Sequence, residues 1–142
     1  MSHVIAVASG KGGVGKTLIT ASLAIALRRR GYTVLAVDAD MGMRNLDLLL
    51  GVQDEVFFDV YDVMKKHCKA ADALVPVGPA GDFLAASQKK TWEKADPKDF
   101  VRVISRLSEN YDYVLIDCPP GRDGAFKSAT AVAEKILFVV EP

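Results

Sequence analysis

The sequence predicts an α/β fold with a mostly parallel sheet and helices on both of its faces. Short apolar runs without alternation recur along the chain, as expected for strands that are covered on both faces of a parallel sheet. Segments with apolar residues at helical spacing lie between these runs. Since strands that alternate with helices form parallel sheets through right-handed crossovers, we expect one such domain over residues 1–142.

The predicted strands begin with an uninterrupted apolar run from Val4 to Val7. Four more apolar runs of this kind follow, so the expected strands cover residues 3–8, 33–37, 83–86, 113–116 and 136–140. Ligands of such sheets bind at the carboxyl ends of the strands. The segments that directly follow the strands are therefore the first place to look for a functional site.

The first predicted helix covers residues 18–30. Its expected inward face consists of Ile19, Leu23, Ala26 and Leu27. Three arginines at 28–30 precede Gly31 at its end. Basic residues complement the negative end of the helix dipole, and glycine accepts the left-handed backbone of a helix cap. We therefore interpret the arginine run as a helix end rather than a nucleic-acid surface.

Shorter helices are predicted at residues 59–67 and 70–75, followed by a loop at 78–81. A further helix begins with Asp96 as N-cap and Pro97 in its first position, and another covers residues 124–133. The expected inward side chains of these helices are Val60, Val63, Met64, Val101, Ile104, Leu107, Phe126 and Val132.

The composition argues against several classes of protein, namely nonspecific DNA-binding, secreted and membrane-spanning proteins. Eighteen basic and 18 acidic residues give a net charge of zero, which argues against a nonspecific DNA-binding protein but allows a local basic face. Cys68 and Cys118 fit no metal-binding spacing and suit a reducing, cytoplasmic location. The N-terminus lacks the pattern of a signal peptide, and no apolar stretch approaches the length of a membrane span.

A glycine-rich motif follows the first predicted strand and opens the first helix, which is the context in which it binds phosphate. It consists of Gly10, Lys11, Gly12, Gly13, Val14, Gly15, Lys16 and Thr17, which satisfy GxxxxGK[ST]. Glycines let successive N–H groups surround phosphate oxygens, and the helix adds its positive end. Lys16 is the candidate for the β- and γ-phosphates, and the Thr17 hydroxyl for Mg²⁺. We expect the next residue, Leu18, to lie at the same nucleotide site.

Carboxylates end two of the predicted strands. Asp38 and Asp40 close the second strand, where a Mg²⁺–water shell would relieve the repulsion between the two acids. The spacing equally allows a polar strand end in which Asp40 caps the following turn. Asp117 closes the fourth strand and fits a carboxylate that holds Mg²⁺ through water, although the Pro-Pro-Gly sequence at 119–121 also suits a simple turn.

Three of these stretches resemble the deviant Walker A family of P-loop ATPases, which includes MinD, ParA, the flagellar-number regulator FlhG and the nitrogenase iron protein. Lys11 in KGGVGKT matches the family pattern KGGxGK[ST], and DCPPG at 117–121 is similar to its switch II. The stretch DADMGMRNLDLLLG at 38–51 resembles the MinD pattern DxDxGxRNLDLxxG. FlhG proteins typically carry Ala-Asn-Val-Asp where this chain has Arg-Asn-Leu-Asp at 44–47.

The resemblance implies ATP and Mg²⁺ as cofactors, ATP hydrolysis, and an ATP-dependent homodimer in which Lys11 reaches the partner's phosphates. Asp40 would orient the attacking water or hold the metal-water shell, Asp38 would support the nucleotide site, and Gly121 would offer its N–H to the γ-phosphate. The implied catalytic residues are Lys11, Lys16 and Asp40. The implied metal ligands are Thr17, Asp40 and Asp117.

The resemblance also implies a role in division-site placement, with regulatory partners similar to MinC and MinE. MinD proteins are nearly twice as long, so the segment that reads the base and the amphipathic helix that binds membrane are not represented in these 142 residues. We expect a cytoplasmic protein that is peripheral to the inner membrane where such a tail is present. The alternatives are a FlhG-like regulator, a ParA-like DNA-positioning ATPase, which the neutral charge disfavours, and an inactive fragment that binds phosphate without a base pocket.

Overall fold

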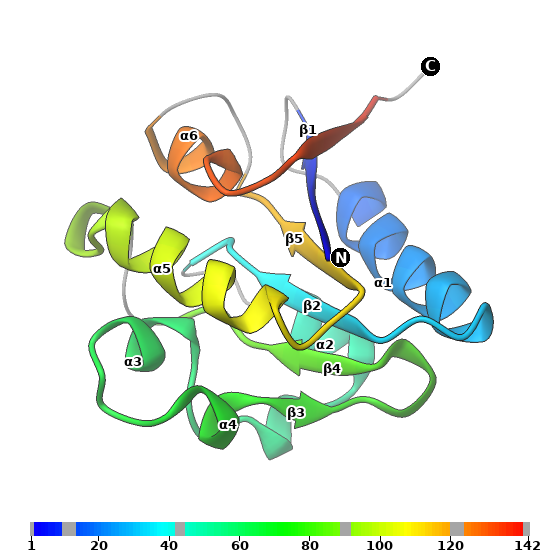
Figure 1. Cartoon of the computed structure of the whole chain (residues 1–142), viewed down its shortest axis with the longest axis horizontal. Helices are drawn as coiled ribbons and strands as arrows, with labels where there is room; N and C mark the ends of the chain where they lie inside the picture. The colour runs from blue at the N-terminus through cyan, green and yellow to red at the C-terminus, as the bar shows by residue number, and fades with distance from the viewer. Residues whose placement is uncertain (1, 10–13, 42–44, 89–91, 120–123, 141–142) are drawn as a thin grey trace.

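The computed structural model is built around a six-stranded sheet with the strand order β3-β4-β2-β5-β1-β6. It describes residues 2–9, 14–41, 45–88, 92–119 and 124–140. All neighbouring strands pair in parallel except β3, which runs antiparallel to β4 at one edge (Figure 1). The strands are β1 (His3–Ser9), β2 (Val34–Asp38), β3 (Val75–Pro76), β4 (Asp82–Leu84), β5 (Tyr113–Asp117) and β6 (Lys135–Val139).

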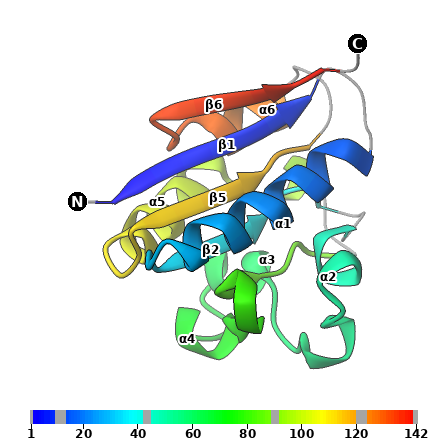
Figure 2. The ribbon, with the colours of Figure 1, turned by 90° about the vertical axis from the view of Figure 1, so that its right-hand side faces the viewer.

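Helices cover both faces of this sheet, as the sequence predicts. Figure 2 shows α1 lying across one face, with α5 and α6 on the other. The α-helices are α1 (Val14–Arg29), α2 (Asn45–Leu50), α3 (Val60–Met64), α4 (Ala70–Ala73), α5 (Pro97–Ser108) and α6 (Gly124–Thr130). Short 3₁₀ turns, η1 (Gln53–Glu55), η2 (Gly78–Ala80) and η3 (Trp92–Lys94), join some of these elements. Every residue of β2 is buried, which explains its continuous apolar run.

The predicted inward face of α1 is confirmed for Leu23 and Leu27, which pack against the core, and wrong for Ile19 and Ala26. Ile19 and Ala26 are exposed, whereas Leu23 and Leu27 are partly buried, and the fully buried positions are Thr20 and Ala24. The helix packs against the sheet through small side chains, which allow a close approach that large apolar residues would prevent. The predicted end of the helix is confirmed, because arginines occupy its last turn and Gly31 follows with a φ of 92°.

The predicted start of α5 is confirmed, whereas one of its inward residues is wrong. The Asp96 carboxylate accepts the N–H of Lys98, and Pro97 occupies the first helical position. The buried residues of this helix are Phe100, Val103, Ile104, Leu107 and Ser108. Val101 is only partly buried, because it lies one position beyond the stripe that faces the sheet.

Several other elements differ from the prediction in their bounds. The strand expected at 83–86 ends at Leu84, and the helix expected at 70–75 ends at Ala73, because Val75 pairs with Phe83 in β3. The sequence did not predict α2 or β3, which are only six and two residues long. The inward positions Val60, Val63 and Met64 are confirmed as buried, and Phe126 and Val132 pack against the same core, as expected.

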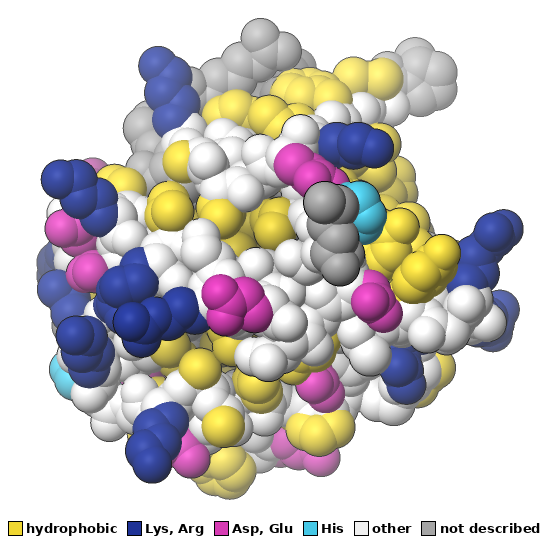
Figure 3. Space-filling view, viewed as in Figure 1, with side chains coloured by type: hydrophobic (Ala, Val, Ile, Leu, Met, Phe, Trp, Pro, Cys, Tyr) yellow, Lys and Arg dark blue, Asp and Glu magenta, His cyan; other side chains and the backbone are white. Residues whose placement is uncertain are grey.

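Charged side chains of both signs are distributed over the face shown in Figure 3. Lys and Arg side chains gather at the left of this view, over α3 and α5. There the Arg102 guanidinium donates to the carbonyl of Met64 at 3.1 Å and lies 3.5 Å from the carboxylate of Asp99. Among the described residues, no helix is long and apolar enough to cross a membrane.

Candidate functional site

A buried ion pair joins the beginning of α1 to the end of β5. The Lys16 ammonium donates to the Asp117 carboxylate at 2.5 Å and to the carbonyl of Cys118 at the same distance. The side chain of Lys16 is 3% exposed and that of Asp117 is 1% exposed. A charge at such depth is stable only with a partner, so the two segments hold each other in place.

The second oxygen of the same carboxylate accepts the Thr17 hydroxyl at 3.0 Å. Burial raises the pKa of Asp117, while the charge of Lys16 and the hydrogen bonds from Lys16 and Thr17 lower it in part. Lys16 and Thr17 both lie in the first turn of α1, where backbone N–H groups are free to bind anions. An ammonium, a hydroxyl and a carboxylate thus converge where the helix dipole is positive.

Asp38 and Asp40 lie at the neighbouring end of β2, as the sequence predicts, but they face different surroundings. The Asp38 carboxylate is fully buried and accepts two backbone N–H groups, that of Asp40 at 3.0 Å and that of Leu46 at 3.3 Å. Burial, followed by the charge of Asp117, raises the pKa of Asp38 to about 7. Asp38 therefore connects the end of β2 to the first turn of α2.

The Asp40 carboxylate is the more accessible of the two acids, although the residue is only 9% exposed. Burial raises its pKa, the charge of Lys16 lowers it, and the charge of Asp117 raises it again. These influences place Asp40 in the electrostatic field of the pair between Lys16 and Asp117. The structure thus brings together the ends of β2 and β5 and the beginning of α1.

The structure describes only some of the remaining predicted site residues. Gly10, Lys11, Gly12, Gly13 and Gly121 lie outside the described residues. Val14 begins α1, Gly15 lies exposed in its first turn, and the Leu18 side chain is 51% exposed. The part of the chain that the structure describes contains no cluster of three or more His, Cys, Asp or Glu side chains that could hold a metal ion. Mg²⁺ does not need such a cluster, because it is usually held by one or two carboxylates together with water and phosphate oxygens.

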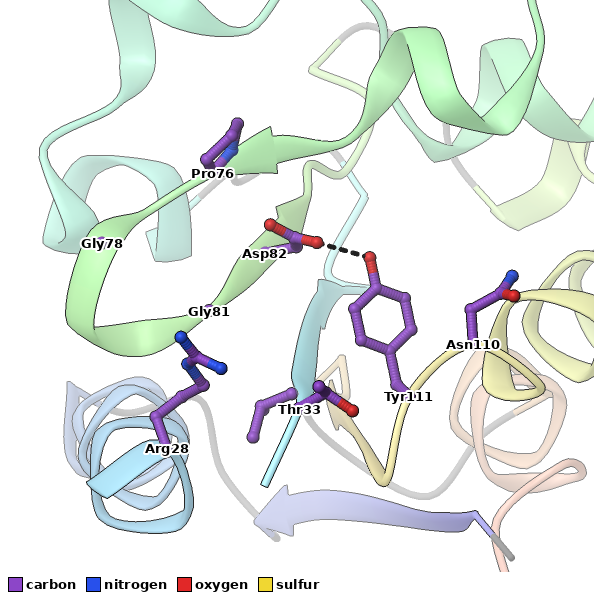
Figure 4. Close-up of a pocket in the computed structure, with 9 residues that line it drawn as sticks. Arg28, Thr33, Pro76, Gly78, Gly81, Asp82, Asn110 and Tyr111 are labelled. Atoms are coloured by element: carbon purple, nitrogen blue, oxygen red, sulfur yellow. Dashed lines mark hydrogen bonds between the residues drawn. The ribbon is translucent and has the colours of Figure 1, made fainter. Parts of the chain in front are cut away.

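A separate cavity of about 470 Å³ lies at the opposite end of the sheet, where β2, β4 and β5 begin. Figure 4 shows Arg28 and Tyr111 among the residues that line it. The Tyr111 hydroxyl donates to the Asp82 carboxylate at 2.6 Å, and Arg28 is within 3.5 Å of the carbonyl of Tyr32. These polar groups already have partners, and none of the predicted site residues lines the cavity. We therefore place the candidate site at the carboxyl ends of the strands.

The fold and these motifs match known proteins along the whole chain. A family model described as an AAA domain matches residues 2–142. The chain belongs to this AAA domain family. The septum site-determining protein MinD of Helicobacter pylori is 43% identical over 144 residues, which cover 100% of this chain and 54% of that protein. The chain thus spans about half the length of the curated relatives it matches.

Solved structures show the same relationship. The septum site-determining protein MinD from Pyrococcus horikoshii, complexed with Mg-ADP, has a TM-score of 0.86 at 40% identity, over 99% of this chain and 58% of that one. MinD in the MinC:MinD cell division complex of Aquifex aeolicus has a TM-score of 0.87 at 36% identity, over 98% and 56%. A cobyrinic acid a,c-diamide synthase from Mycobacterium smegmatis with a bound ATP analogue and magnesium has a TM-score of 0.85 at 28% identity, over 99% and 59%. The P-loop fold predicted from the sequence is therefore confirmed.

Proposed function

We propose that the protein binds Mg·ATP at the beginning of α1 and hydrolyses it to ADP and phosphate, as a nucleotide-dependent switch related to MinD. The observation that carries the proposal is the convergence of Lys16, Thr17 and Asp117 beside Asp40. The motif GxxxxGK[ST] begins directly after β1 in the sequence, and its last four residues form the first turn of α1. MinD of P. horikoshii and the M. smegmatis synthase, which share this fold, were solved with magnesium and adenine nucleotides.

Lys16 and Thr17 have the chemistry required for this ligand. The ammonium of Lys16 would turn from Asp117 towards the β- and γ-phosphates, and the Thr17 hydroxyl would ligate Mg²⁺. Asp117 would then hold the metal through a water molecule, which keeps its buried charge compensated. When bound, Mg²⁺ neutralises charge that develops on the phosphates.

Asp40 is the candidate to orient the attacking water. Its carboxylate is close enough to Lys16 and Asp117 to respond to their charges, and burial raises its pKa, which makes it a better proton acceptor than an exposed aspartate. Lys11 would add a second cation from the partner subunit of an ATP-dependent homodimer, and the Gly121 N–H would contact the γ-phosphate. Catalysis would then consist mainly of positioning and charge stabilisation.

The cellular role that we propose is division-site placement, with a MinC-like and a MinE-like regulatory partner. The likeness to MinD of H. pylori and to the MinD of the A. aeolicus MinC:MinD complex supports this assignment over a FlhG-like or ParA-like role. The RNLD sequence at 44–47 also supports the assignment to a MinD-like role. The proposed location is the cytoplasm, peripheral to the inner membrane where a membrane-binding tail is present. DNA is not an expected ligand, because the net charge is zero.

The experiment that tests this proposal compares Lys16→Ala and Lys11→Ala in binding, hydrolysis and oligomer assays. Lys98→Ala, an exposed lysine of α5, is the matched control for removing one cation. We expect K16A to abolish Mg·ATP binding, K11A to keep monomer binding but lose dimerisation and hydrolysis, and K98A to behave as the wild type. Normal hydrolysis by K11A would refute the deviant Walker A mechanism, and a salt-sensitive gel shift in the presence of ATP would favour the ParA-like alternative.

A further inference from the structure

The peptide unit between Ala39 and Asp40 is held by a side chain at each of its two polar atoms. Its N–H donates to the Asp38 carboxylate at 3.0 Å. Its carbonyl accepts the indole Nε1–H of Trp92 at 2.8 Å. Trp92 comes from η3, 53 residues further along the chain, so this clamp joins the end of β2 to a distant segment.

The indole of Trp92 is held in place by packing against the hydrophobic core. It packs against the same hydrophobic cluster that contains Ala39 and Met41, and its ring meets that of Phe100 edge to face with centroids 5.1 Å apart. Phe100 is fully buried in α5, and the beginning of that helix is fixed by its Asp96 cap. Because its ring is held by this packing, the Trp92 indole N–H favours one orientation of the Ala39 carbonyl that it binds.

The clamped peptide directly precedes the candidate catalytic carboxylate. Fixing both the N–H and the C=O of one peptide removes its freedom to rotate about the flanking backbone bonds. The Cα of Asp40 is then held in place, and only the side-chain torsions of Asp40 stay adjustable. Hydrolysis depends steeply on the placement of a water-orienting group, because small displacements from the productive geometry cost large factors in rate.

We propose that Trp92 is a positioning residue of the ATPase site, whose indole N–H fixes the Ala39–Asp40 peptide and thereby orients the Asp40 carboxylate. The inference rests on the proposed function. If Trp92 were only an apolar residue of the core, its packing alone would matter. The hydrogen bond and the packing can be separated, because phenylalanine and leucine both lack the donor but fill the site to different degrees.

The test compares Trp92→Phe and Trp92→Leu with Val103→Ala, which weakens the same hydrophobic cluster and keeps the indole donor. All are assayed well below their unfolding temperatures. We expect W92F and W92L to lose about the same factor in kcat, about tenfold, with KM and Mg·ATP affinity changed less than about threefold. V103A should keep the wild-type kcat. If kcat instead follows thermal stability, so that V103A falls as far as W92F, Trp92 only packs.

A second readout is independent of nucleotide. Because Trp92 is the only tryptophan, its indole N–H gives a single resolved signal in a ¹H–¹⁵N spectrum. We expect this proton to exchange with solvent at least about tenfold more slowly in the wild type than in the unfolded chain. Exchange at the unfolded rate would overturn the clamp itself. A wild type that binds Mg·ATP without hydrolysing it would refute the proposed function, whereas normal kcat in W92F would refute the positioning role alone.

Discussion

Lys16 and Asp117 form an ion pair that connects residues 101 positions apart in the sequence, and both side chains are almost completely buried. The pair ties the first helix to the end of β5 and sets the charges of the candidate site. Its members also have separate tasks in the proposed function, one towards phosphate and one towards Mg²⁺. The pair therefore links the stability of the fold to its chemistry.

Asp117→Ala should be strongly destabilising, because it leaves the Lys16 ammonium buried without its counter-ion. We expect the free energy of unfolding to fall by about 3 kcal/mol. Urea denaturation of D117A, K16A and the double variant measures the coupling between the two residues. The double variant should be more stable than the sum of the single losses predicts. Strict additivity would show that the pair contributes nothing of its own.

Asp38 should make the nucleotide-free protein less stable as pH rises. Its pKa is about 7 in the folded state against 3.8 for an ordinary aspartate, so the folded state binds the proton more tightly. The stability that this contributes is complete below pH 4 and is lost as pH rises through about 7, on the order of 4 kcal/mol in total. Unfolding curves across this range should therefore slope less steeply in Asp38→Asn, which cannot titrate. Equal slopes in D38N and the wild type would contradict the assignment.

Gly81 allows η2 to approach β2 closely. Its backbone has φ 93° and ψ −134°, a region almost restricted to glycine, and a Cβ at this position would lie 2.4 Å from the carbonyl oxygen of Val34. Gly31 has a similar φ of 92° but open space around it, which makes it the matched control. We expect Gly81→Ala to cost about 3 kcal/mol and Gly31→Ala about 1 kcal/mol of unfolding free energy. Similar losses in both variants would argue against the close approach.

The two cysteines should react with thiol reagents at very different rates. Cys118 is fully buried, and burial raises the pKa of its thiol to about 12. Cys68 is partly buried, and its pKa is raised by burial and by nearby carboxylates, mainly Asp62. Iodoacetamide at pH 8 should label Cys68 at least about tenfold faster in the folded protein, and both equally in urea. Cys68→Ser should remove the fast phase, so a fast phase that persists in this variant would show that Cys118 is accessible.

The site residues that the sequence revealed are those with a local signature. Lys16 and Thr17 belong to one contiguous motif, and Asp117 ends a continuous apolar strand. The contact between Trp92 and Ala39 has no such signature, because it depends on how η3 folds back onto β2. The spacing of Asp38 and Asp40 could not predict their different roles. A carboxylate that accepts backbone N–H groups and a carboxylate that faces the site have the same appearance in a sequence.

In the fold too, the sequence predicted the elements that have a local pattern and missed those that depend on tertiary contacts. Continuous apolar runs identified every long strand, although burial on both faces explains the run of β2 and not that of β6, which lies at the edge of the sheet and is largely exposed. Apolar periodicity identified Leu23 and Leu27 on α1 but missed Thr20 and Ala24, which are fully buried where small side chains allow a close approach to the sheet. The short elements α2 and β3 lack enough residues for any periodicity and form only through their tertiary contacts.

The most direct test of the nucleotide site is a crystal structure grown with Mg²⁺ and a non-hydrolysable ATP analogue. The account predicts phosphates at the beginning of α1, Lys16 turned from Asp117 towards them, and the Thr17 hydroxyl about 2.1 Å from Mg²⁺. A nucleotide bound instead in the cavity beside Arg28 and Tyr111, with the Lys16–Asp117 pair intact, would contradict it.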